Sequence, residues 1–378
     1  MAPPSPSTES GACSTSVEDL YGSGAAKLKA PRHAEPSSEP GVAPDDLGKL
    51  FAWETWMLER LFDPALCPGA AARRARFRAN MNHGVRLHSD HSGLGTAEMV
   101  GHRVDRASAS LGISPRGSVT AHRACDVKES SLHLLRHFGD EAPEHLHENV
   151  LDALKDDLRQ RLVRMQPDPS WPRSRQQAAY KAILKVMHEA YEQDSLFNDS
   201  AAGYCILHDK DCPGFFAGSA GITMSVHGTA CTAWSAQGKH DGACHPSVLP
   251  WFCFVYYVLT FQPTIAIHEI TELHPEEFFQ FHFGHMYDIT SFHVSPFQLG
   301  YPCRRPRRYR LLVHKSKAVS SVEYFAFLHC RPSIQAQSLF CAEPEMLTDS
   351  FDKLARTRHR IPKPGCRSEE HTSELQSP

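Results

Sequence analysis

The pattern of apolar and polar positions changes along the chain and divides it into segments of different kinds. Residues 1–45 are rich in Pro, Ser, Ala and Gly without a periodic apolar pattern, which predicts a disordered lead-in. Apolar residues at helical spacing follow from Leu47 to Phe62, so residues 46–84 are expected to form a helical extension. The core sheet is predicted to begin at Val85.

From Val85 onward, short apolar strands alternate with helical segments. Further strands are predicted to end at Asp126, near Asn149 and at Glu269, and another covers residues 287–292. Helical periodicity is found between Asp126 and His137 and over 149–163, 173–191, 251–261 and 278–283. This alternation predicts an α/β fold with a doubly wound, mostly parallel sheet, whose binding residues gather at the carboxyl ends of its strands.

A loop with two glycines follows the first predicted strand. In Ser92-Gly93-Leu94-Gly95, the glycines permit a sharp bend between strand and helix and let the backbone approach a ligand closely. The carboxylate of Asp126, at the end of the next strand, can accept hydrogen bonds from both ribose hydroxyls of an adenosine-type ligand. By itself, a Gly-x-Gly pair is more often a simple turn.

Cys231 stands in a frame of small residues, Gly228-x-x-Cys231-x-x-x-Ser235-x-x-Gly238. Such a tight loop suits a cysteine that must reach a substrate, and the thiolate is the reactive form of that side chain. The alternative is a packed thiol, since free cysteine is often buried.

Two further motifs follow Cys231 along the chain. A buried strand over residues 263–269 ends in the carboxylate of Glu269, and the run Gly300-Tyr-Pro-Cys-Arg-Arg305-Pro-Arg307 comes after it. Taken singly, the first could be a surface charge and the second a solvated basic loop. Their occurrence in one order with the glycine loop and Cys231 favours a shared site.

Together these motifs resemble those of the cytosine-C5 DNA methyltransferases over residues 85–313. The glycine loop is similar to the Phe-x-Gly-x-Gly loop that binds S-adenosylmethionine (SAM), and the Cys231 loop is similar to Pro-Cys-x-x-x-Ser. Glu269 matches the acid of Glu-Asn-Val, and Arg305 and Arg307 match the arginines of Gly-x-Pro-Gln-x-Arg-x-Arg.

The resemblance implies SAM-dependent transfer of a methyl group to C5 of cytosine in DNA, on a Rossmann-like sheet. Cys231 would add to C6 of the base, and Glu269, protonated or sharing a proton, would hydrogen-bond N3 and the exocyclic amine. Arg305 would hold the O2 side of the ring or orient the thiolate, and Arg307 would add positive potential near the phosphates. The base would have to be flipped out of the duplex. The implied SAM-binding residues are Ser92, Gly93, Gly95, Asp126 and Asn149.

Two alternatives stay open beside this reading. The family includes enzymes that act on transfer RNA, so RNA is a second candidate substrate. Several positions depart from the family pattern, which is also compatible with an inactive, nucleic-acid-binding relative. The departures are Asn149 for aspartate, Ala230 for proline, Ile270 for asparagine and Cys303 for glutamine.

The same resemblance sets the expected domain limits. Residues 85–313 would form the catalytic domain, with a helical insertion at about 153–222, and residues 314–366 would be a partial C-terminal region. Residues 367–378 look like the translation of a sequencing adapter, so we expect an artefactual tail and a chain truncated at its 3′ end.

Composition limits the partners and the location. Apolar residues make up 41% and charged residues 22%, as in a soluble globular protein, and the net charge of −3 means that any nucleic-acid surface must be local. The apolar stretch Trp251 to Phe261 is too short to cross a bilayer, so no membrane partner is expected. The 12 cysteines lack a paired framework and no signal peptide opens the chain, so we expect an intracellular, nuclear location.

One more cysteine motif lies in the predicted insertion. The spacing Cys205-x-x-His208-x-x-x-Cys212 suits zinc, but three ligands do not close a structural site. With 12 Cys and 24 His in the chain, chance clusters are expected, so the prediction is that no metal is bound. A zinc-dependent or purely structural protein is the corresponding third class of function.

Overall fold

The structure is a computed structural model of the 378-residue chain. The residues that it describes are 41–42, 52–215, 221–230, 234, 245, 248–272, 274–299, 301, 305–319 and 330–331. All predicted site residues except Cys231 fall within these ranges.

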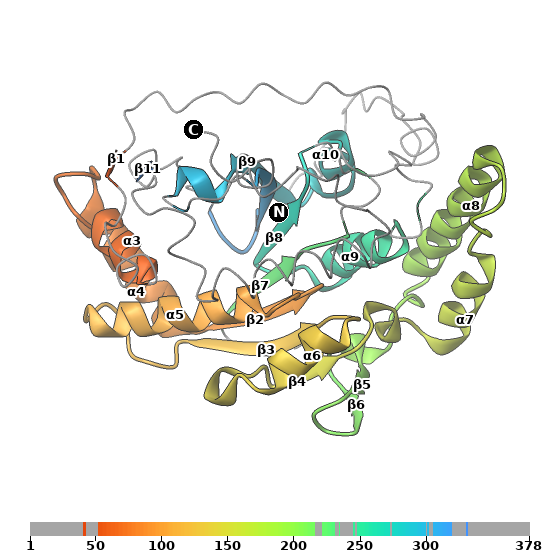
Figure 1. Ribbon diagram of the computed structural model, residues 1–378, viewed down its shortest axis with the longest axis horizontal. Helices are drawn as coiled ribbons and strands as arrows, with labels where there is room; N and C mark the ends of the chain where they lie inside the picture. Colours follow the sequence, from red (N-terminus) through yellow and green to blue (C-terminus); the bar gives the residue numbers. More distant parts are fainter. Residues whose placement is uncertain are drawn as a thin grey trace, which may run out of the picture.

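A mixed sheet of nine strands organises the described part of the chain (Figure 1). Its five central strands are parallel, in the order β4-β3-β2-β7-β8. They are β2 (Val85–Asp90), β3 (Val119–Cys125), β4 (His145–His147), β7 (Ile222–His227) and β8 (Ile265–Ile270). Antiparallel strands extend the sheet at both ends, with β5 (Gly203–Cys205) and β6 (Lys210–Cys212) beyond β4, and β10 (Arg307–His314) and β9 (Tyr287–Val294) beyond β8.

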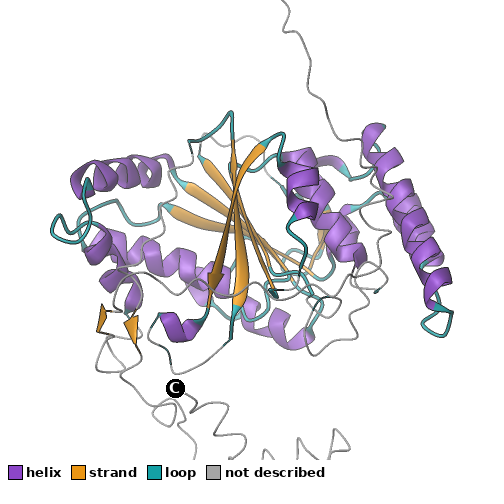
Figure 2. Ribbon diagram, turned by 90° about the horizontal axis from the view of Figure 1, so that it is seen from above, coloured by secondary structure: helices purple, strands orange, loops and turns teal. Residues whose placement is uncertain are grey.

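Helices lie on both sides of this sheet (Figure 2). Two helices precede β2, namely α3 (Trp53–Leu61) and α4 (Ala70–His83), and α3 packs on α5 (Thr96–Ser110), which contacts β2 and β3. The remaining α-helices of the described chain are α6 (Glu129–Arg136), α7 (Asp156–Met165), α8 (Arg173–Glu192), α9 (Val248–Phe261) and α10 (Glu277–Phe283). The predicted α/β fold with mostly parallel central strands is therefore confirmed.

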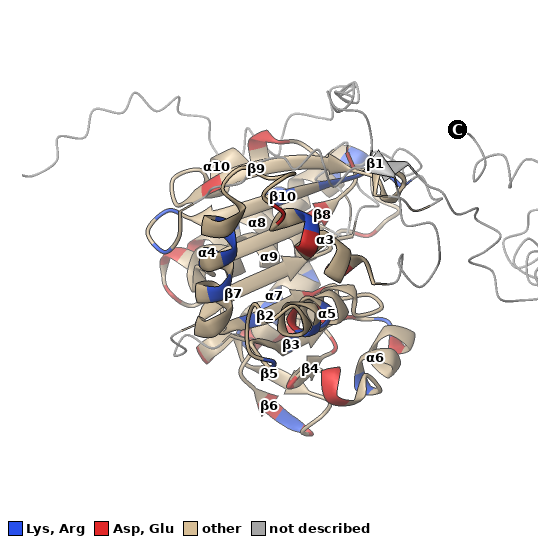
Figure 3. Ribbon diagram, turned by 90° about the vertical axis from the view of Figure 1, so that its left-hand side faces the viewer, with Lys and Arg blue, Asp and Glu red and all other residues tan. Residues whose placement is uncertain are grey.

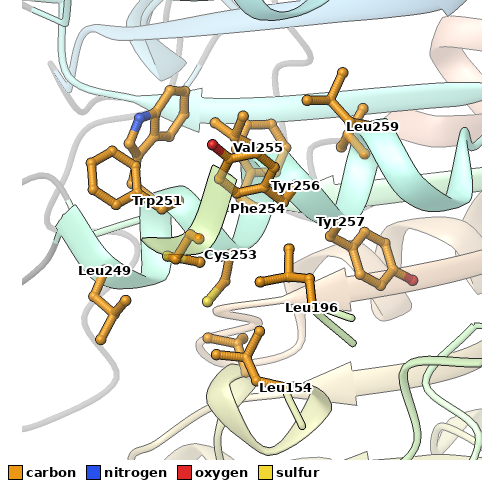
Figure 4. Packing of buried hydrophobic residues seen from close by; sticks show 14 of the residues in the cluster. Leu154, Leu196, Leu249, Trp251, Cys253, Phe254, Val255, Tyr256, Tyr257 and Leu259 are labelled. Carbon is orange, nitrogen blue, oxygen red and sulfur yellow. The ribbon is translucent and has the colours of Figure 1, made fainter. Parts of the chain in front are cut away.

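Helix α9 forms the centre of the main hydrophobic core. It is apolar on every side, and 11 of its 14 residues are buried, because it is enclosed by the sheet and by other helices. Figure 4 shows Leu154 and Leu196, which flank α7 and α8, on the side of α9 that carries Cys253. Each fully buried side chain of this size contributes about 1.5–3 kcal/mol to folding.

No helix in the described ranges combines the length and the apolar character that a membrane crossing requires.

Arginines attach α4 to the end of α5, and Figure 3 shows the basic positions along α4. Arg74 donates to the carbonyl of Leu111 at 3.1 Å, and Arg78 donates to the carbonyls of Gly112 and Ile113 at 2.9 and 2.7 Å. These carbonyls follow the last turn of α5, where cations are favourable because of the helix dipole. The basic face of α4 is thus partly used inside the protein.

Three local features differ from the sequence expectation. The helix predicted over 149–163 is divided into the 3₁₀ turn η2 (Val150–Ala153) and α7, because Leu154 between them is extended and forms a β-bridge with Phe197. Gly41–Val42, inside the predicted lead-in, form β1, which pairs with β11 (Cys330–Arg331). The third is strand β10, which begins within the arginine motif.

Strand β10 was missed because its sequence, Arg-Arg-Tyr-Arg, is typical of a solvated loop. In the structure Arg310 is fully buried, and its Nε donates to Glu276 at 3.0 Å. Its Nη2 donates to the carbonyl of His274 at 2.9 Å, and its guanidinium lies 4.2 Å from the centre of the Phe279 ring. These partners come from the segment around α10, so the local sequence of β10 does not reveal them.

The core also holds several neutral histidines. Burial lowers the pKa of His227 and His282 to about 3, and it holds the pKa of His268 and His274 well below the usual value. In an unfolded chain the same rings would take up protons near pH ~6.5. The unfolded state therefore binds more protons than the folded state in mildly acidic solution.

We expect the free energy of unfolding to fall when the pH is lowered from about 7 to about 5. Each of the four rings contributes up to about 1.4 kcal/mol per pH unit below its unfolded pKa. Glu98, whose pKa burial raises, acts in the opposite direction, but it is one group against four. Urea unfolding at the two pH values checks this, and a midpoint that is unchanged or higher in acid would contradict it.

Candidate active site

The strand order of the sheet reverses at β2, because β3 lies on one side of it and β7 on the other. In open parallel sheets, ligands bind outside the carboxyl ends of the strands at such a reversal. The predicted cofactor residues follow β2, β3 and β4. Glu269 lies at the end of β8, and Arg305 and Arg307 lie near the start of β10, which is antiparallel to β8 and so begins at the same edge.

The loop after β2 is bonded to the end of β3. The backbone N–H of Ser92 donates to the carbonyl of Cys125 at 3.0 Å, and Ser92 Oγ accepts from the N–H of Cys125 at 3.1 Å. Gly93 and Gly95 have φ angles of 59° and 75°, in the left-handed region that favours glycine. A Cβ at Gly93 would meet nothing within 4 Å, whereas one at Gly95 would lie 2.5 Å from the Phe138 ring. Gly93 thus leaves the backbone open, and Gly95 permits close packing.

Asp126 follows β3 directly and joins the loop after β2 to the loop after β3. Its Oδ2 accepts a hydrogen bond from the N–H of Gly93 at 2.8 Å, and its Oδ1 accepts one from the N–H of Lys128 at 2.8 Å. A carboxylate has about four acceptor positions, so each oxygen retains capacity for a ligand hydroxyl. The geometry is compatible with the ribose-binding role that the sequence predicts.

An open hollow of about 1130 Å³ lies beyond β3 and β4, and Val127 and Asn149 are among its lining residues. Val127 follows Asp126 and is 71% exposed, so it offers an apolar surface beside the polar groups. Asn149 Oδ1 accepts a hydrogen bond from the N–H of Leu151 at 3.0 Å and caps η2. The hollow is large enough for a ligand of nucleoside size.

On the other side of β2, Glu269 of β8 and Arg307 of β10 form an ion pair, with 2.8 Å between Oε1 and Nε. Both side chains are half-buried. The other carboxylate oxygen of Glu269 lies 3.7 Å from where a Cβ of Gly228 would stand, so Glu269 faces the loop after β7. Burial and the nearby Glu269 raise the pKa of Tyr309, whereas Arg307 and Arg305 lower it.

The loop that leads to Cys231 is fixed at its start. The N–H of Gly228 donates to the carbonyl of Asp90 at 3.2 Å, and Thr229 Oγ1 lies 2.8 Å from Nε2 of His268. Thr229 is buried, whereas Ala230 is exposed. Cys231 comes next and lies outside the described residues.

Arg305 lies two residues before β10, and its side chain is exposed. Its backbone N–H donates to Ser295 Oγ at 3.1 Å, which fixes the position of the backbone there. Among the ion pairs of the described chain, Arg307 rather than Arg305 is the partner of Glu269. The structure therefore brings Glu269 and Arg307 together and leaves Arg305 at the rim.

A buried charged cluster beneath this edge was missed by the sequence analysis. Asp90, the last residue of β2, lies 2.9 Å from Nη2 of Arg123 and 3.4 Å from Nδ1 of His227. Burial acts to raise the pKa of Asp90, but the charge of Arg123 and the nearby His227 hold it below its usual value. The signal in the sequence was a charged residue in each of the first two strands that were predicted for the core sheet.

A second buried acid, Glu98, lies in the first turn of α5 and is also missing from the predicted site. It is 0% exposed and accepts a hydrogen bond from Ser89 Oγ, which in turn bonds Ser92 Oγ. Burial raises the pKa of Glu98. Glu98 follows the glycine loop three residues after Gly95, but nothing in the sequence indicates that it is enclosed.

Comparisons place the chain near methyltransferases at low similarity. No family model and no curated protein match it. Among solved structures it is similar to an E. coli prophage protein described as a DNA modification methyltransferase, the Entamoeba histolytica methyltransferase EhMeth and the S. pombe Dnmt2 methyltransferase. The identities are 13%, 14% and 11% over 63%, 64% and 63% of this chain, with TM-scores of 0.34, 0.33 and 0.29.

The chain covers 49%, 55% and 51% of those three proteins, which is about half of their length. At TM-scores of this size the likeness carries no weight for function, which has to be inferred from the geometry of the site.

The two loop glycines provide a matched test of the local geometry. Gly95→Ala should lower the free energy of unfolding by about 2–5 kcal/mol, because it combines left-handed strain with overlap at Phe138 and the buried Leu135. Gly93→Ala carries only the strain, about 1–2 kcal/mol. Chemical denaturation of both variants measures the difference, and equal losses would refute the packing role of Gly95.

Proposed function

We propose that this protein is a SAM-dependent methyltransferase with a doubly wound, Rossmann-like sheet, which methylates C5 of cytosine in DNA. The observation that carries the proposal is the pairing of two half-sites at one edge of the sheet. The bond between Asp126 and Gly93 lies on one side of β2, and the ion pair between Glu269 and Arg307 lies on the other. A cofactor and a base bound at these places would meet at the point where the strand order reverses.

The first half-site fits SAM, which supplies the methyl group when it is bound. Asp126 would accept hydrogen bonds from the ribose hydroxyls through its remaining acceptor positions. The open backbone at Gly93 would allow a close approach of the ligand, and Ser92 and Gly95 would keep the loop in shape. The hollow at Asn149 would receive the adenine end.

The second half-site supplies the groups that cytosine C5 methylation requires. The Cys231 thiolate would add to C6, which moves the electron pair of the C5–C6 bond toward N3 and makes C5 nucleophilic. Glu269, protonated or sharing a proton, would donate a hydrogen bond to N3 and accept one from the exocyclic amine, which stabilises the charge that develops on N3. After C5 has taken the methyl group, a base removes the C5 proton, the double bond re-forms and the thiolate leaves.

Arg307, bonded to one oxygen of Glu269, would hold this carboxyl group in position during these steps. The neighbouring Ile270 is 1% exposed and belongs to the core, so it contributes no hydrogen bond to the site. The ion pair to Arg307 replaces the orienting contact that an asparagine at position 270 would offer. This compensation favours an active enzyme over an inactive, nucleic-acid-binding relative.

A trapping experiment tests the chemistry. The full-length protein, incubated with SAM and a duplex that contains 5-fluorocytosine, should form a covalent adduct through Cys231, because fluorine at C5 cannot leave as a proton does. Cys231→Ser should abolish the adduct. Glu269→Gln should lower its rate by about 10²–10³-fold, as expected when a group that stabilises the developing charge is removed.

Glu272→Gln is the matched control, since Glu272 follows the same strand and pairs with His293 at 3.6 Å. It should leave adduct formation unchanged. An adduct that persists in Cys231→Ser would refute the mechanism. Adduct formation on an RNA substrate alone would reassign the substrate to RNA.

Cofactor binding can be tested separately with two aspartates, Asp126 and Asp105, which each accept hydrogen bonds from two backbone N–H groups. Asp126→Asn should weaken SAM binding about 10-fold or more in calorimetric titration, because a charged acceptor of two ribose hydroxyls is lost. Asp105 also accepts two backbone N–H groups at 2.8 Å, from Gly117 and Ser118, but at the opposite edge of the sheet. Asp105→Asn should leave the SAM affinity unchanged, and an equal loss in both variants would contradict the assignment of Asp126.

A further inference from the structure

Two cysteines and two histidines meet at the edge of the sheet where β4, β5 and β6 lie side by side. One potential ligand atom from each residue lies within 4.8 Å of the others. Nδ1 of His208 is 3.4 Å from Sγ of Cys205 and 3.5 Å from Sγ of Cys212. The fourth member is His145, the first residue of β4, which is distant in sequence from the other three.

We propose that these four residues bind one structural zinc ion. Cys₂His₂ is a common ligand set of closed zinc sites, with four ligands in a tetrahedron. With Zn–S and Zn–N bonds of about 2.3 and 2.05 Å, sulfur and nitrogen at two corners of the tetrahedron lie about 3.6 Å apart. The two sulfur–nitrogen distances at His208 agree with this value, so these side chains already have the spacing that the ion requires.

Two further observations support a metal site, one at His145 and one at Cys205. Nδ1 of His145 is buried without a hydrogen-bond partner in the described chain, and an unsatisfied buried nitrogen costs about 1–3 kcal/mol unless something binds it. Sγ of Cys205 accepts a hydrogen bond from the N–H of Leu146 at 3.4 Å. A backbone N–H that donates to the sulfur in this way stabilises the negative charge of a thiolate ligand.

The local backbone explains why the fold would need the ion. Strands β4, β5 and β6 each have three residues, and β4 pairs with β5 only at His147 and Cys205. Such short pairing is weak on its own. A zinc ion would join the start of β4 to both strands of the hairpin and so hold in place the strand that leads to Asn149 and the hollow.

The sequence motif supplied three ligands and led to the expectation that no metal is bound. His145 completes the set only because β4 and the hairpin are neighbours in the folded sheet. The inference is independent of the methyltransferase proposal, because none of the four residues belongs to either half-site.

The test uses full-length protein from a zinc-supplemented culture, dialysed into metal-free buffer. Elemental analysis should find about one zinc per chain. His145→Ala and Cys212→Ser should each reduce the bound zinc at least about 10-fold, as removal of one ligand implies. His122→Ala is the matched control, since the His122 ring lies 4.9 Å from that of His145 but is bonded to Glu144. It should retain its zinc.

Cobalt substitution of the unaltered protein keeps the proposal testable if the variants fail to fold. Co²⁺ should give the absorption of a tetrahedral site together with thiolate-to-cobalt charge-transfer bands. Substoichiometric zinc, a cobalt spectrum without these bands, or a disulfide between Cys205 and Cys212 would overturn the proposal. Loss of zinc in His122→Ala with retention in Cys212→Ser would also overturn it.

Discussion

Asp90 and Arg123 form an ion pair beneath the carboxyl edge of the sheet, where only 8% and 3% of their side chains are exposed. The pair joins β2 to β3, and His227 brings β7 to the same carboxylate. Arg123 also lies 5.6 Å from the ring of Tyr257 on α9, so the core helix contacts the same cluster. Removal of one charge would leave the other buried and unpaired, which typically costs about 3–5 kcal/mol.

The loops of the candidate active site start from the strands that this cluster joins. The carbonyl of Asp90 accepts a hydrogen bond from Gly228, and Asp126 comes three residues after Arg123 and holds Gly93. The buried cluster thus sets the spacing between the two half-sites. Beyond β4, the hairpin of β5 and β6 pairs with the sheet only at His147 and Cys205, and there the proposed zinc ion would supply the missing constraint.

Much of the fold could be predicted from the sequence because its signals are local. The strand that ends near Glu269 is a largely apolar run, and the glycine loop marks the turn after β2. The missed features all depend on partners from elsewhere in the chain. Arg310 is buried in β10 because Glu276 and His274 lie beside it, and Leu154 is extended because it pairs with Phe197.

The same distinction applies to the candidate sites. Glu269 and Arg307 were predicted as members of separate motifs, and their contact follows from the antiparallel pairing of β8 and β10. The most direct test of the account is a crystal structure with S-adenosylhomocysteine, the demethylated product of SAM. We predict a ribose bonded to Asp126 and a sulfur that faces Glu269 and the loop that begins at Gly228. A ligand bound elsewhere, or no binding by the folded protein, would contradict the account.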